Sequence, residues 1–403
     1  MSEKDLISSD INTYIANQAA KDTLRFITCG SVDDGKSTLI GRLLYESKMI
    51  FDDQLSALQK DSSKFGTQGD EIDFALLVDG LAAEREQGIT IDVAYRFFTT
   101  DKRKFIVADT PGHQQYTRNM ATGASTASLA ILMIDARKGI LEQTRRHAFI
   151  ASLLGIKQIV LAVNKLDLVD YSEAVFNQIS ADFDVIQKKH LKFDHVQAIP
   201  LSALKGDNII ELSDNTPWYQ GPTLMEWLET VENAKIVKGP LRLPIQYVLR
   251  PNLDYRGYAG RVASGSVAPG NKVKILPSGV ETVIEEITSM DGALDSAEEG
   301  ASIAVTLQDE VDASRGDMVV EASASAELSD QFRVNIIWMH EQQMMPGRSY
   351  IIKIEGGTAN ATIAKPRYKI NVNNYERLPA DVLELNDIGS CNISLDRNIA
   401  FDA

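Results

Sequence analysis

The nine residues 30-GSVDDGKST-38 decide the fold of this chain. They follow the apolar run 24-LRFITC-29, which has the length of a strand, and precede 39-LIGRLL-44, which has the apolar spacing of a helix. A Gly-x-x-x-x-Gly-Lys-Ser frame between a strand and a helix is typical of a phosphate-binding loop. Many unlike nucleotide-binding proteins share that frame, so the base, the reaction and the class of protein must come from the rest of the sequence.

Each residue type in this loop suits a phosphate ligand. Gly30 and Gly35 permit the tight backbone path. Lys36 is expected to reach the β and γ oxygens and to act catalytically, and Ser37 is expected to supply a hydroxyl to Mg²⁺. The amides from Asp33 onward are expected to point inward, so the predicted phosphate-binding residues are Gly30, Asp33, Asp34, Gly35, Lys36, Ser37 and Thr38.

Two aspartates lie in the loop although its ligand is anionic. Backbone amides rather than side chains make the cradle, so Asp33 and Asp34 can point outward while their N–H groups point in. For both residues two interpretations stay open. Each is either a solvated carboxylate in a turn or a residue with a role in nucleotide release or in bracing the loop.

Composition places the chain among globular proteins with two or three domains. Its 403 residues are 44% hydrophobic and 24% charged, which is ordinary for this class. No apolar run approaches the roughly 20 residues of a membrane helix, and the start MSEKDLISSD lacks a signal-peptide pattern, so we expect a cytoplasmic protein without a membrane partner. A net charge of -15 argues against a nucleic-acid partner. Cys29 and Cys391 are expected to be reduced core thiols.

Apolar runs of strand length alternate with helical patterns from residue 23 to residue 232. This alternation indicates an α/β domain with a mostly parallel sheet and helices on both faces. The predicted strands are 24-LRFITC-29, 104-KFIVAD-109, 129-LAILMID-135, 158-QIVLAVN-164 and 196-VQAIPL-201. Ligands bind such sheets beyond the carboxyl ends of the strands. Before this domain, residues 1–22 contain a short amphipathic repeat that predicts a helical extension, with a frayed tail as the alternative.

The pattern changes after the predicted linker 233-NAKIVKGP-240. Short alternating stretches such as 303-IAVTL-307 are broken by turn signals. We expect two small antiparallel β-barrels, at 241–327 and 328–403. No closing strand is evident after 396-DRNIAFDA-403, so the third domain is expected to be truncated at its C-terminus.

The segment 109-DTPGH-113 follows a predicted strand and suits the γ-phosphate. A carboxylate at a strand end beside a phosphate loop can hold Mg²⁺ through water, and Asp109 fits that role. The Gly112 amide can bond the γ-phosphate. In GTPases the next position aims the attacking water, and a neutral imidazole at His113 can accept a hydrogen bond from it. His113 is therefore a predicted catalytic residue.

The segment 164-NKLD-167 follows another predicted strand and suits a guanine base. The Asp167 carboxylate can accept hydrogen bonds from guanine N1–H and the 2-amino group, a donor pair that adenine lacks. Asn164 can reach the opposite edge of the base, and the Lys165 stem can stack on the ring. A second base-contacting loop follows the strand at 196–201 and consists of Ser202, Ala203 and Leu204.

The segment 84-EREQGITID-92 offers the remaining part of a nucleotide switch. Thr90 can place its hydroxyl on Mg²⁺ and its amide on the γ-phosphate, which makes it a predicted metal ligand and catalytic residue. Loss of the γ-phosphate would release such a segment, so hydrolysis becomes a change of shape. Together these loops indicate a GTPase that binds GTP or GDP with Mg²⁺.

With these residues in place, the chain resembles the elongation factor Tu-like class of translation-factor GTPases over essentially its whole length. The shared motifs are 30-GSVDDGKST-38, 88-GIT-90, 109-DTPGH-113, 164-NKLD-167 and 202-SAL-204, followed by two β-barrels. Within that class it is most similar to the GTPase subunits of bacterial heterodimeric sulfate adenylyltransferases. The specific features are Asp34, where elongation factors usually carry histidine, and the stretches 346-PGRSYIIKI-354 and 390-SCNISLDRNIAFD-402.

The resemblance implies that a separate catalytic subunit makes adenosine 5'-phosphosulfate and pyrophosphate from ATP and sulfate, and that this chain hydrolyses GTP to drive that reaction. We place no ATP or sulfate site here, because the sequence has one phosphate loop and no sulfate-binding motif. An adenylylsulfate kinase, fused or separate, is a further implied partner. One alternative is an elongation factor 1A-like GTPase that delivers tRNA. Another is an ATP-dependent kinase, which Asn164 and Asp167 oppose.

Overall fold

The computed structural model describes residues 21–47, 74–78, 90, 92–232, 239–252, 255–354 and 356–402. The chain divides into two compact units: unit 1 is Met1–Ala234 with Asn371–Glu376, and unit 2 is Lys235–Ile370 with Arg377–Ala403. Most of the predicted helical extension, of the segment 84–92 and of the linker 233–240 lies outside the described residues.

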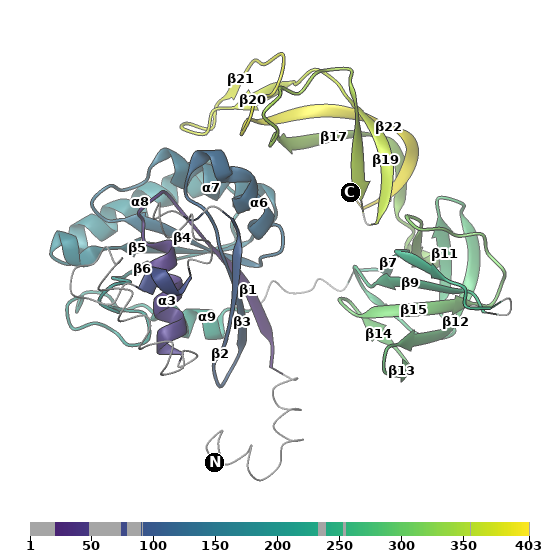
Figure 1. Ribbon diagram of the computed structural model, residues 1–403, viewed down its shortest axis with the longest axis horizontal. Coiled ribbons are helices and arrows are strands. Elements are labelled where there is room, and N and C mark those ends of the chain that lie inside the picture. The colour runs from purple at the N-terminus through teal and green to yellow at the C-terminus, as the bar shows by residue number, and fades with distance from the viewer. Residues whose placement is uncertain are drawn as a thin grey trace, which may run out of the picture. The chain divides into compact units, whose positions relative to one another are not determined.

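Unit 1 is built on a six-stranded sheet in the order β2-β3-β1-β4-β5-β6 (Figure 1). All neighbours except β2 and β3 pair in parallel. The five predicted strands are all present, and β4 and β5 are buried along their whole length. The strands are β1 (Thr23–Cys29), β2 (Ala94–Thr99), β3 (Lys104–Asp109), β4 (Leu129–Asp135), β5 (Gln158–Asn164) and β6 (His195–Pro200).

The edge strand β2 is the strand that the sequence analysis did not predict. Its sequence AYRFFT alternates between half-buried and exposed residues for most of its length, so it lacks the continuous apolar run of a central strand. β2 runs antiparallel to β3, and Ala94 lies opposite Asp109. The hairpin therefore brings the chain that follows Thr90 to the carboxyl end of β3.

Helices cover both faces of this sheet. α3 (Lys36–Glu46) and α9 (Leu224–Thr230) share a core with β1, β3, β4 and β5 on one face. α6 (Thr117–Ala124), α7 (Glu142–Leu153) and α8 (Glu173–His190) contact the sheet from the other face, and Figure 1 draws these three helices together at the top of the unit. The carboxyl ends of the parallel strands thus meet at one edge, between the two helical layers.

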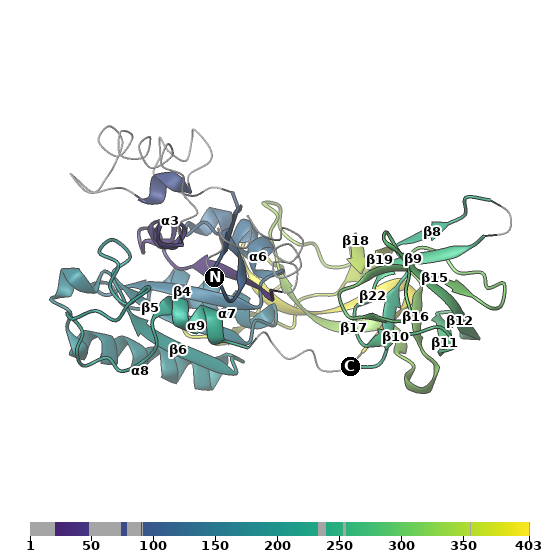
Figure 2. The same ribbon diagram turned by 90° about the horizontal axis from the view of Figure 1, so that it is seen from below.

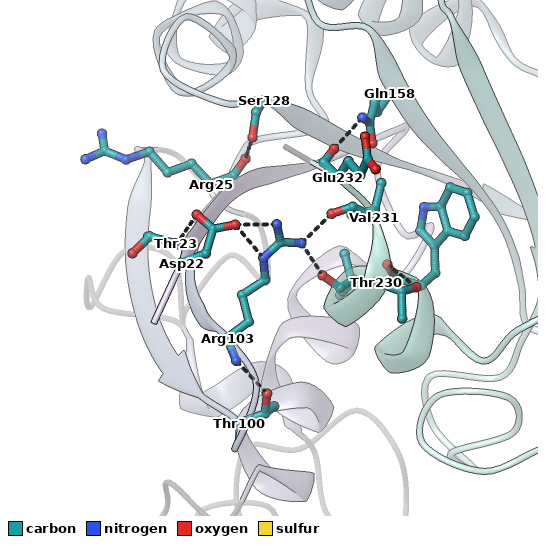
Figure 3. Close-up of polar contacts among 12 residues, drawn as sticks. Asp22, Thr23, Arg25, Thr100, Arg103, Ser128, Gln158, Thr230, Val231 and Glu232 are labelled. Atoms are coloured by element: carbon teal, nitrogen blue, oxygen red, sulfur yellow. Dashed lines mark hydrogen bonds and ion pairs between the residues drawn. The ribbon is translucent and has the colours of Figure 1, made fainter. Parts of the chain in front are cut away.

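A buried arginine joins the chain before β1 to the chain at the end of α9 (Figure 3). The Arg103 guanidinium lies in the turn between β2 and β3 and donates to Asp22 Oδ2 at 2.5 and 3.2 Å. It also donates to the carbonyl oxygens of Leu228 at 3.0 Å and Val231 at 2.6 Å, at the end of α9. Nearby, Gln158 donates to the Glu232 carbonyl at 2.6 Å. The chain before β1 and the chain after α9 are therefore held at one place.

The described residues of unit 2 form antiparallel sheets with one short 3₁₀ helix, η4 (Ala322–Ala324). The larger sheet follows the order β7-β16-β11-β12-β15-β9-β8, and Figure 2 shows β9, β15 and β12 near one another. Its inward residues include Val273, Ile275, Ile303 and Val305, which pack into one apolar core. The strands are β7 (Arg242–Pro244), β8 (Tyr247–Leu249), β9 (Gly257–Arg261), β11 (Lys272–Leu276), β12 (Val280–Ser289), β15 (Ser302–Leu307) and β16 (Met318–Glu321), with the short β10 (Ser266–Val267), β13 (Gly292–Ala293) and β14 (Ala297–Glu298) beside them.

The second sheet of unit 2 is organised around its last strand. β22 (Ile388–Phe401) pairs with β17 (Glu327–Ile337), β19 (Gly357–Ile363) and β20 (Tyr368–Ile370). β18 (Ser349–Ile354) and β21 (Arg377–Leu378) complete it. Residues 396–401, after which a closing strand was expected, are themselves the end of β22, and residues 399–401 pair with the start of β17.

Two composition-based expectations can be compared with the structure. Cys29 and Cys391 are free and buried, as predicted. No helix within the described ranges is both long and apolar enough to cross a membrane.

Candidate functional site

The phosphate-loop sequence lies between β1 and α3, at the carboxyl edge of the sheet. Gly30 and Gly35 have φ angles of 146° and 92°, which side-chain-bearing residues rarely adopt. The first helical hydrogen bond of α3 runs from Leu39 N to Gly35 O, so the amides of residues 35–38 have no acceptor within the helix. These amides give the N-terminus of α3 a partial positive charge that faces the loop, which suits an anion.

The two aspartates of the loop have different environments. Asp33 is exposed, which agrees with an outward side chain. Asp34 is 1% exposed, and its Oδ2 accepts a hydrogen bond from Ser31 N at 2.6 Å. Of the two interpretations left open for Asp34, the solvated carboxylate is therefore wrong, because a backbone amide three residues upstream supplies the partner that makes burial of the carboxylate tolerable.

Lys36 lies inside the loop and contacts its backbone. Its ammonium donates to Ser31 O at 2.7 Å, and the side chain is buried. Burial lowers the pKa of Lys36 below its ordinary value, although the carboxylates of Asp34 and Asp109 oppose that shift. An anionic phosphate group at this position would favour the charged ammonium.

Three oxygen-bearing side chains expected to serve Mg²⁺ meet beside the loop. Ser37 Oγ donates to Asp109 Oδ2 at 2.7 Å and lies 3.3 Å from Thr90 Oγ1. Thr28 Oγ1 donates to the other Asp109 oxygen at 3.3 Å and orients the carboxylate. Two hydroxyls and one carboxylate fit a hard cation that keeps part of its water shell, whereas the described residues contain no cluster of three His, Cys, Asp or Glu side chains.

Gly112 brings its backbone against the phosphate loop. A Cβ at this residue would lie 2.6 Å from Lys36 Nζ and 2.8 Å from Val32 N, so a side chain has no room. The close approach places the 109–113 segment where its amide can face the ligand of the loop. It also explains why glycine suits this position better than any other residue.

His113 follows at the surface and begins the short helix η2 (Gln114–Tyr116). Its Nδ1 accepts a hydrogen bond from Gln115 N at 3.4 Å. In a neutral ring Nε2 then carries the proton, so in this conformation Nε2 would orient a water by donating to it. The structure thus exposes His113 beside Gly112 but does not place it on a reacting atom.

Asn164 links three loops at the end of β5. Its Nδ2 donates to Asp34 O at 2.7 Å, and its Oδ1 accepts from Ala203 N at 2.9 Å. The predicted reach of Asn164 to the base would be additional to these two backbone bonds. Its main effect here is to fix the phosphate loop relative to the predicted base-binding loop.

The remaining predicted base-binding residues lie after β5 and β6. Asp167 is half-buried in η3 (Leu166–Val169), and its carboxylate has no hydrogen-bond partner among the described residues. Lys165 Nζ lies 3.4 Å from Asp135 Oδ2, so its stem is held along the end of β4. Burial alone would raise the pKa of Asp135, but hydrogen bonds from Arg137 outweigh it and hold the pKa at about 2. Sequence reasoning missed Asp135, although its place at a strand end is the same signal that identified Asp109.

The 202–204 loop is held by a residue that was also missed. Arg42 of α3 donates to the carbonyl oxygens of Ala203, at 3.2 Å, and Leu204. Its guanidinium also lies over the Phe74 ring, 4.3 Å from the centroid. Arg42 lies five residues after Ser37, but nothing in its spacing predicts a contact more than 160 residues away in the chain.

Two further buried contacts reach the phosphate loop from α7. His147 Nδ1 accepts from Gly30 N at 3.1 Å, and Thr144 Oγ1 lies 3.4 Å from Ser31 Oγ. In addition, Gln143 donates to Gly112 O at 3.5 Å. The first half of α7, EQTRRH, is polar throughout, so the sequence alone does not distinguish these buried residues from solvated ones.

Comparisons with known proteins agree with this fold and site. Residues 21–232 match the family described as Elongation factor Tu GTP binding domain, and residues 331–403 match the family described as GTP-eEF1A C-terminal domain-like. The class of protein is therefore that of the elongation factor Tu-like GTPases, which bind guanine nucleotides.

Curated relatives narrow the class. Sulfate adenylyltransferase subunit 1 of Aeromonas salmonicida (strain A449) is 54% identical over 97% of this chain and 83% of its own length. The same subunit of Saccharophagus degradans is 52% identical over 100% of the chain and 85% of its own length. The bifunctional enzyme NodQ of Rhizobium sp. (strain N33) is 57% identical over 99% of the chain, which spans only 62% of NodQ. The chain belongs to the sulfate adenylyltransferase subunit 1 family of elongation factor Tu-like GTPases.

One solved structure is similar at a greater distance. That of sup35 complexed with GMPPNP covers 100% of this chain and 92% of its own, with 20% identity and a TM-score of 0.41. A similarity at this level carries no argument about the present site.

Proposed function

We propose that this chain is the GTP-hydrolysing, energy-coupling subunit of a sulfate adenylyltransferase. It would use GTP hydrolysis to drive formation of adenosine 5'-phosphosulfate and pyrophosphate from ATP and sulfate on a partner catalytic subunit. The observation that carries the proposal is the convergence of Ser37, Thr90 and Asp109 beside a phosphate loop that Asn164 ties to a base-binding loop. Nearly full-length similarity to proteins named sulfate adenylyltransferase subunit 1 supports the choice of partner reaction.

The phosphate groups of GTP would lie on the amides at the start of α3 and against Lys36. Lys36 Nζ, now 2.7 Å from Ser31 O, needs only a small movement to take a β or γ oxygen as an additional acceptor. Phosphate contacts are proposed for the backbone amides of Asp33, Asp34, Gly35, Ser37, Thr38 and Gly112, and for the Ser37 hydroxyl. The amide of Gly30 is instead bonded to His147, so the predicted role of Gly30 is limited to the path of the loop. Catalysis in such a site consists of positioning and charge stabilisation.

Mg²⁺ fits the group formed by Ser37, Thr90 and Asp109, with Asp109 holding it through water. The ion would offset phosphate charge as the bond to the γ-phosphate breaks. Thr90 would be held by the ion and the γ-phosphate together, so loss of the γ-phosphate would release the chain that leads into β2. This release is the step that a partner could detect.

His113 is proposed to orient the attacking water. Its exposure and its place directly after Gly112 allow the ring to reach a water in line with the γ-phosphate once GTP is bound. For the base, the open carboxylate of Asp167 would select guanine, with Lys165 stacking on the ring and the Ser202, Ala203 and Leu204 loop closing its edge.

Several features of the assembly are part of the same proposal. They are a heterodimer or higher assembly with the catalytic subunit, an adenylylsulfate kinase as a further fused or separate partner, and a cytoplasmic location. The division into domains at 23–232, 241–327 and 328–403 also remains a proposal. A tRNA-delivering GTPase is the alternative function, and the names of the curated relatives favour the sulfate-activating subunit.

The test is to purify the chain together with its native partners and to measure adenylylsulfate formation from ATP and sulfate. GTP should stimulate product formation, whereas GDP and a non-hydrolysable GTP analogue should not. Synthesis that is indifferent to GTP, or tight nucleotide-dependent binding of tRNA by the chain alone, would contradict the proposal.

The Asp167→Asn variant tests whether the effect of GTP depends on the proposed contact with the base. Its amide can donate to the 2-oxo group of xanthine, so XTP should replace GTP both in binding and in driving adenylylsulfate formation. We expect GTP affinity to fall by about 100-fold or more because a paired hydrogen bond to a charged group is lost. A variant that still prefers GTP would show that Asp167 does not contact the base.

A further inference from the structure

The first two amides of the phosphate loop are both bonded to buried side chains behind the loop. Gly30 N donates to His147 Nδ1 at 3.1 Å, and Ser31 N donates to Asp34 Oδ2 at 2.6 Å. His147 is 0% exposed and Asp34 is 1% exposed. The two acceptors come from different elements, since His147 lies on α7 and Asp34 lies in the loop itself.

We infer that Asp34 and His147 are positioning residues that hold the phosphate loop from behind and thereby slow the release of bound guanine nucleotide. The inference rests on the proposed nucleotide site and adds two residues to it. Neither side chain is expected to touch the nucleotide. Their effect would pass through the backbone of Gly30 and Ser31.

Ser31 connects these buried acceptors to the phosphate-binding lysine. Its amide is held by Asp34, its carbonyl accepts from Lys36 Nζ at 2.7 Å, and its Oγ lies 3.4 Å from Thr144 Oγ1. Ser31 is thus held at its amide, its carbonyl and its side chain. If the Ser31 amide lost its acceptor, the backbone angles of Ser31 could change and carry its carbonyl away from Lys36.

Asp34 can act on the loop in two ways, and only one of them depends on its charge. As an acceptor it stabilises the loop, but as a buried anion it repels the phosphates of a nucleotide bound in front of the loop. The charged groups that act on it are Lys36, Asp135 and Lys138, and burial raises its pKa to about 6. Replacing Asp34 by asparagine keeps an oxygen acceptor and removes the charge, whereas alanine removes both.

A pair of variants can likewise test whether the hydrogen bond from Gly30 to His147 is what matters. Burial, with Lys36 and Arg146, lowers the pKa of His147 to about 3, so the ring is neutral and Nδ1 can accept. Nε2 then carries the proton, and it has no hydrogen-bond partner among the described residues. The Oδ1 of asparagine can occupy nearly the same position as Nδ1, so His147→Asn should retain the bond to Gly30 and His147→Ala should lose it.

The experiment measures release of a fluorescent GDP from the purified full chain, chased with excess unlabelled GDP. Asp34→Ala and His147→Ala should each release it at least about tenfold faster, as expected for loss of a buried hydrogen bond. Asp34→Asn and His147→Asn should stay within about threefold of wild type, with Asp34→Asn the slowest to release. Asp182→Ala, on the exposed side of α8, controls for removal of an aspartate and should not change the rate.

A second measurement follows the loop without any nucleotide. Hydrogen–deuterium exchange of the peptide that contains Gly30 and Ser31 should be slow in wild type and in both asparagine variants, and fast in both alanine variants. Equal release and equal exchange in all four variants would overturn the inference. If an alanine variant does not fold, an asparagine variant that releases GDP tenfold faster would overturn it by itself. A wild-type chain that binds no guanine nucleotide would instead refute the proposed function.

Discussion

At the scale of single residues, His113 carries the most specific prediction about the reaction. His113→Ala should slow GTP hydrolysis by about 100-fold or more while GTP affinity changes little, because water positioning is lost and the phosphate cradle remains. Single-turnover hydrolysis and equilibrium binding separate the two effects.

His340 is a matched control for this substitution. Its Nδ1 accepts from the backbone of Gln342 just as His113 accepts from Gln115, but it lies in unit 2. His340→Ala should hydrolyse GTP at the wild-type rate. Unchanged turnover in His113→Ala, with the native partner present, would remove His113 from the mechanism.

The buried pair behind the loop predicts opposite effects of pH on stability. The pKa of Asp34 is raised from 3.8 to about 6, so its contribution to folding stability is greatest below 3.8 and is lost as pH rises toward 6. The pKa of His147 is lowered from 6.5 to about 3, so its contribution is present above 6.5 and is lost as pH falls toward 3. Between about pH 4 and pH 6 the two slopes oppose each other.

Replacing either residue should reveal the pH dependence of folding stability that the other residue causes. On going from pH 6 to pH 4 without nucleotide, Asp34→Asn should lose up to about 2–3 kcal/mol relative to wild type, and His147→Asn should gain a similar amount. Urea unfolding is followed by tryptophan fluorescence in a Trp338→Phe background. The signal then comes from unit 1 alone, since Trp218 and Trp227 both lie there. Shifts of the same sign in both variants would contradict this account.

At the scale of secondary-structure elements, α3 connects the phosphate loop to the base-binding loop. The helix begins at the phosphates with Lys36, and nearly two turns later Arg42 holds the carbonyl oxygens of Ala203 and Leu204. Arg42→Ala should therefore weaken GTP and GDP binding to the same extent, by about tenfold, because the base pocket loosens while the γ-phosphate contacts remain.

Arg42→Lys distinguishes charge from geometry in this contact. A lysine keeps the charge but cannot bond two carbonyl groups as the planar guanidinium does, so its affinity should lie nearer to that of alanine than to wild type. Arg25→Ala on β1 is exposed and should bind both nucleotides normally. Loss of GTP binding without loss of GDP binding would place Arg42 in the γ-phosphate site instead.

The elements also show what the sequence could and could not predict. Central strands such as β4 and β5 are continuous apolar runs, so their type and position were predictable. β2 alternates and lies at an edge, so it was missed. The burial of Asp34 depends on one backbone amide, and the acceptor for Gly30 lies 117 residues away on His147. Such pairings arise from tertiary packing, which local sequence patterns do not encode.

At the scale of the whole molecule, unit 2 is held partly by one arginine near its two ends. The Arg242 guanidinium in β7 binds both oxygens of Asp402 at 2.7 to 3.2 Å, and it donates to Ala324 O at 2.9 Å. The Arg242 side chain is 7% exposed and that of Asp402 is 61% exposed. The two partners should therefore not be equivalent.

Arg242→Ala should lower the free energy of unfolding of unit 2 by about 2 kcal/mol, because it removes a buried guanidinium together with its hydrogen bond to Ala324 O. Asp402→Ala should lower it by less than about 1 kcal/mol, because its carboxylate is mostly solvated. Trp338 is the tryptophan in unit 2, so its fluorescence follows this transition. Equal losses in the two variants would show that the ion pair, not the carbonyl contacts, accounts for the stability.

The position of Arg103 bears on whether such a GTPase domain can be inserted into another protein. The same guanidinium contacts Asp22, just before the first strand, and Val231, just after the last helix, so the ends of the domain lie side by side. A domain with adjoining ends can be inserted into a loop of another protein, or circularly permuted, without stretching its host. The GTPase fold of this chain is thus suited to transfer as a self-contained module between unrelated enzymes.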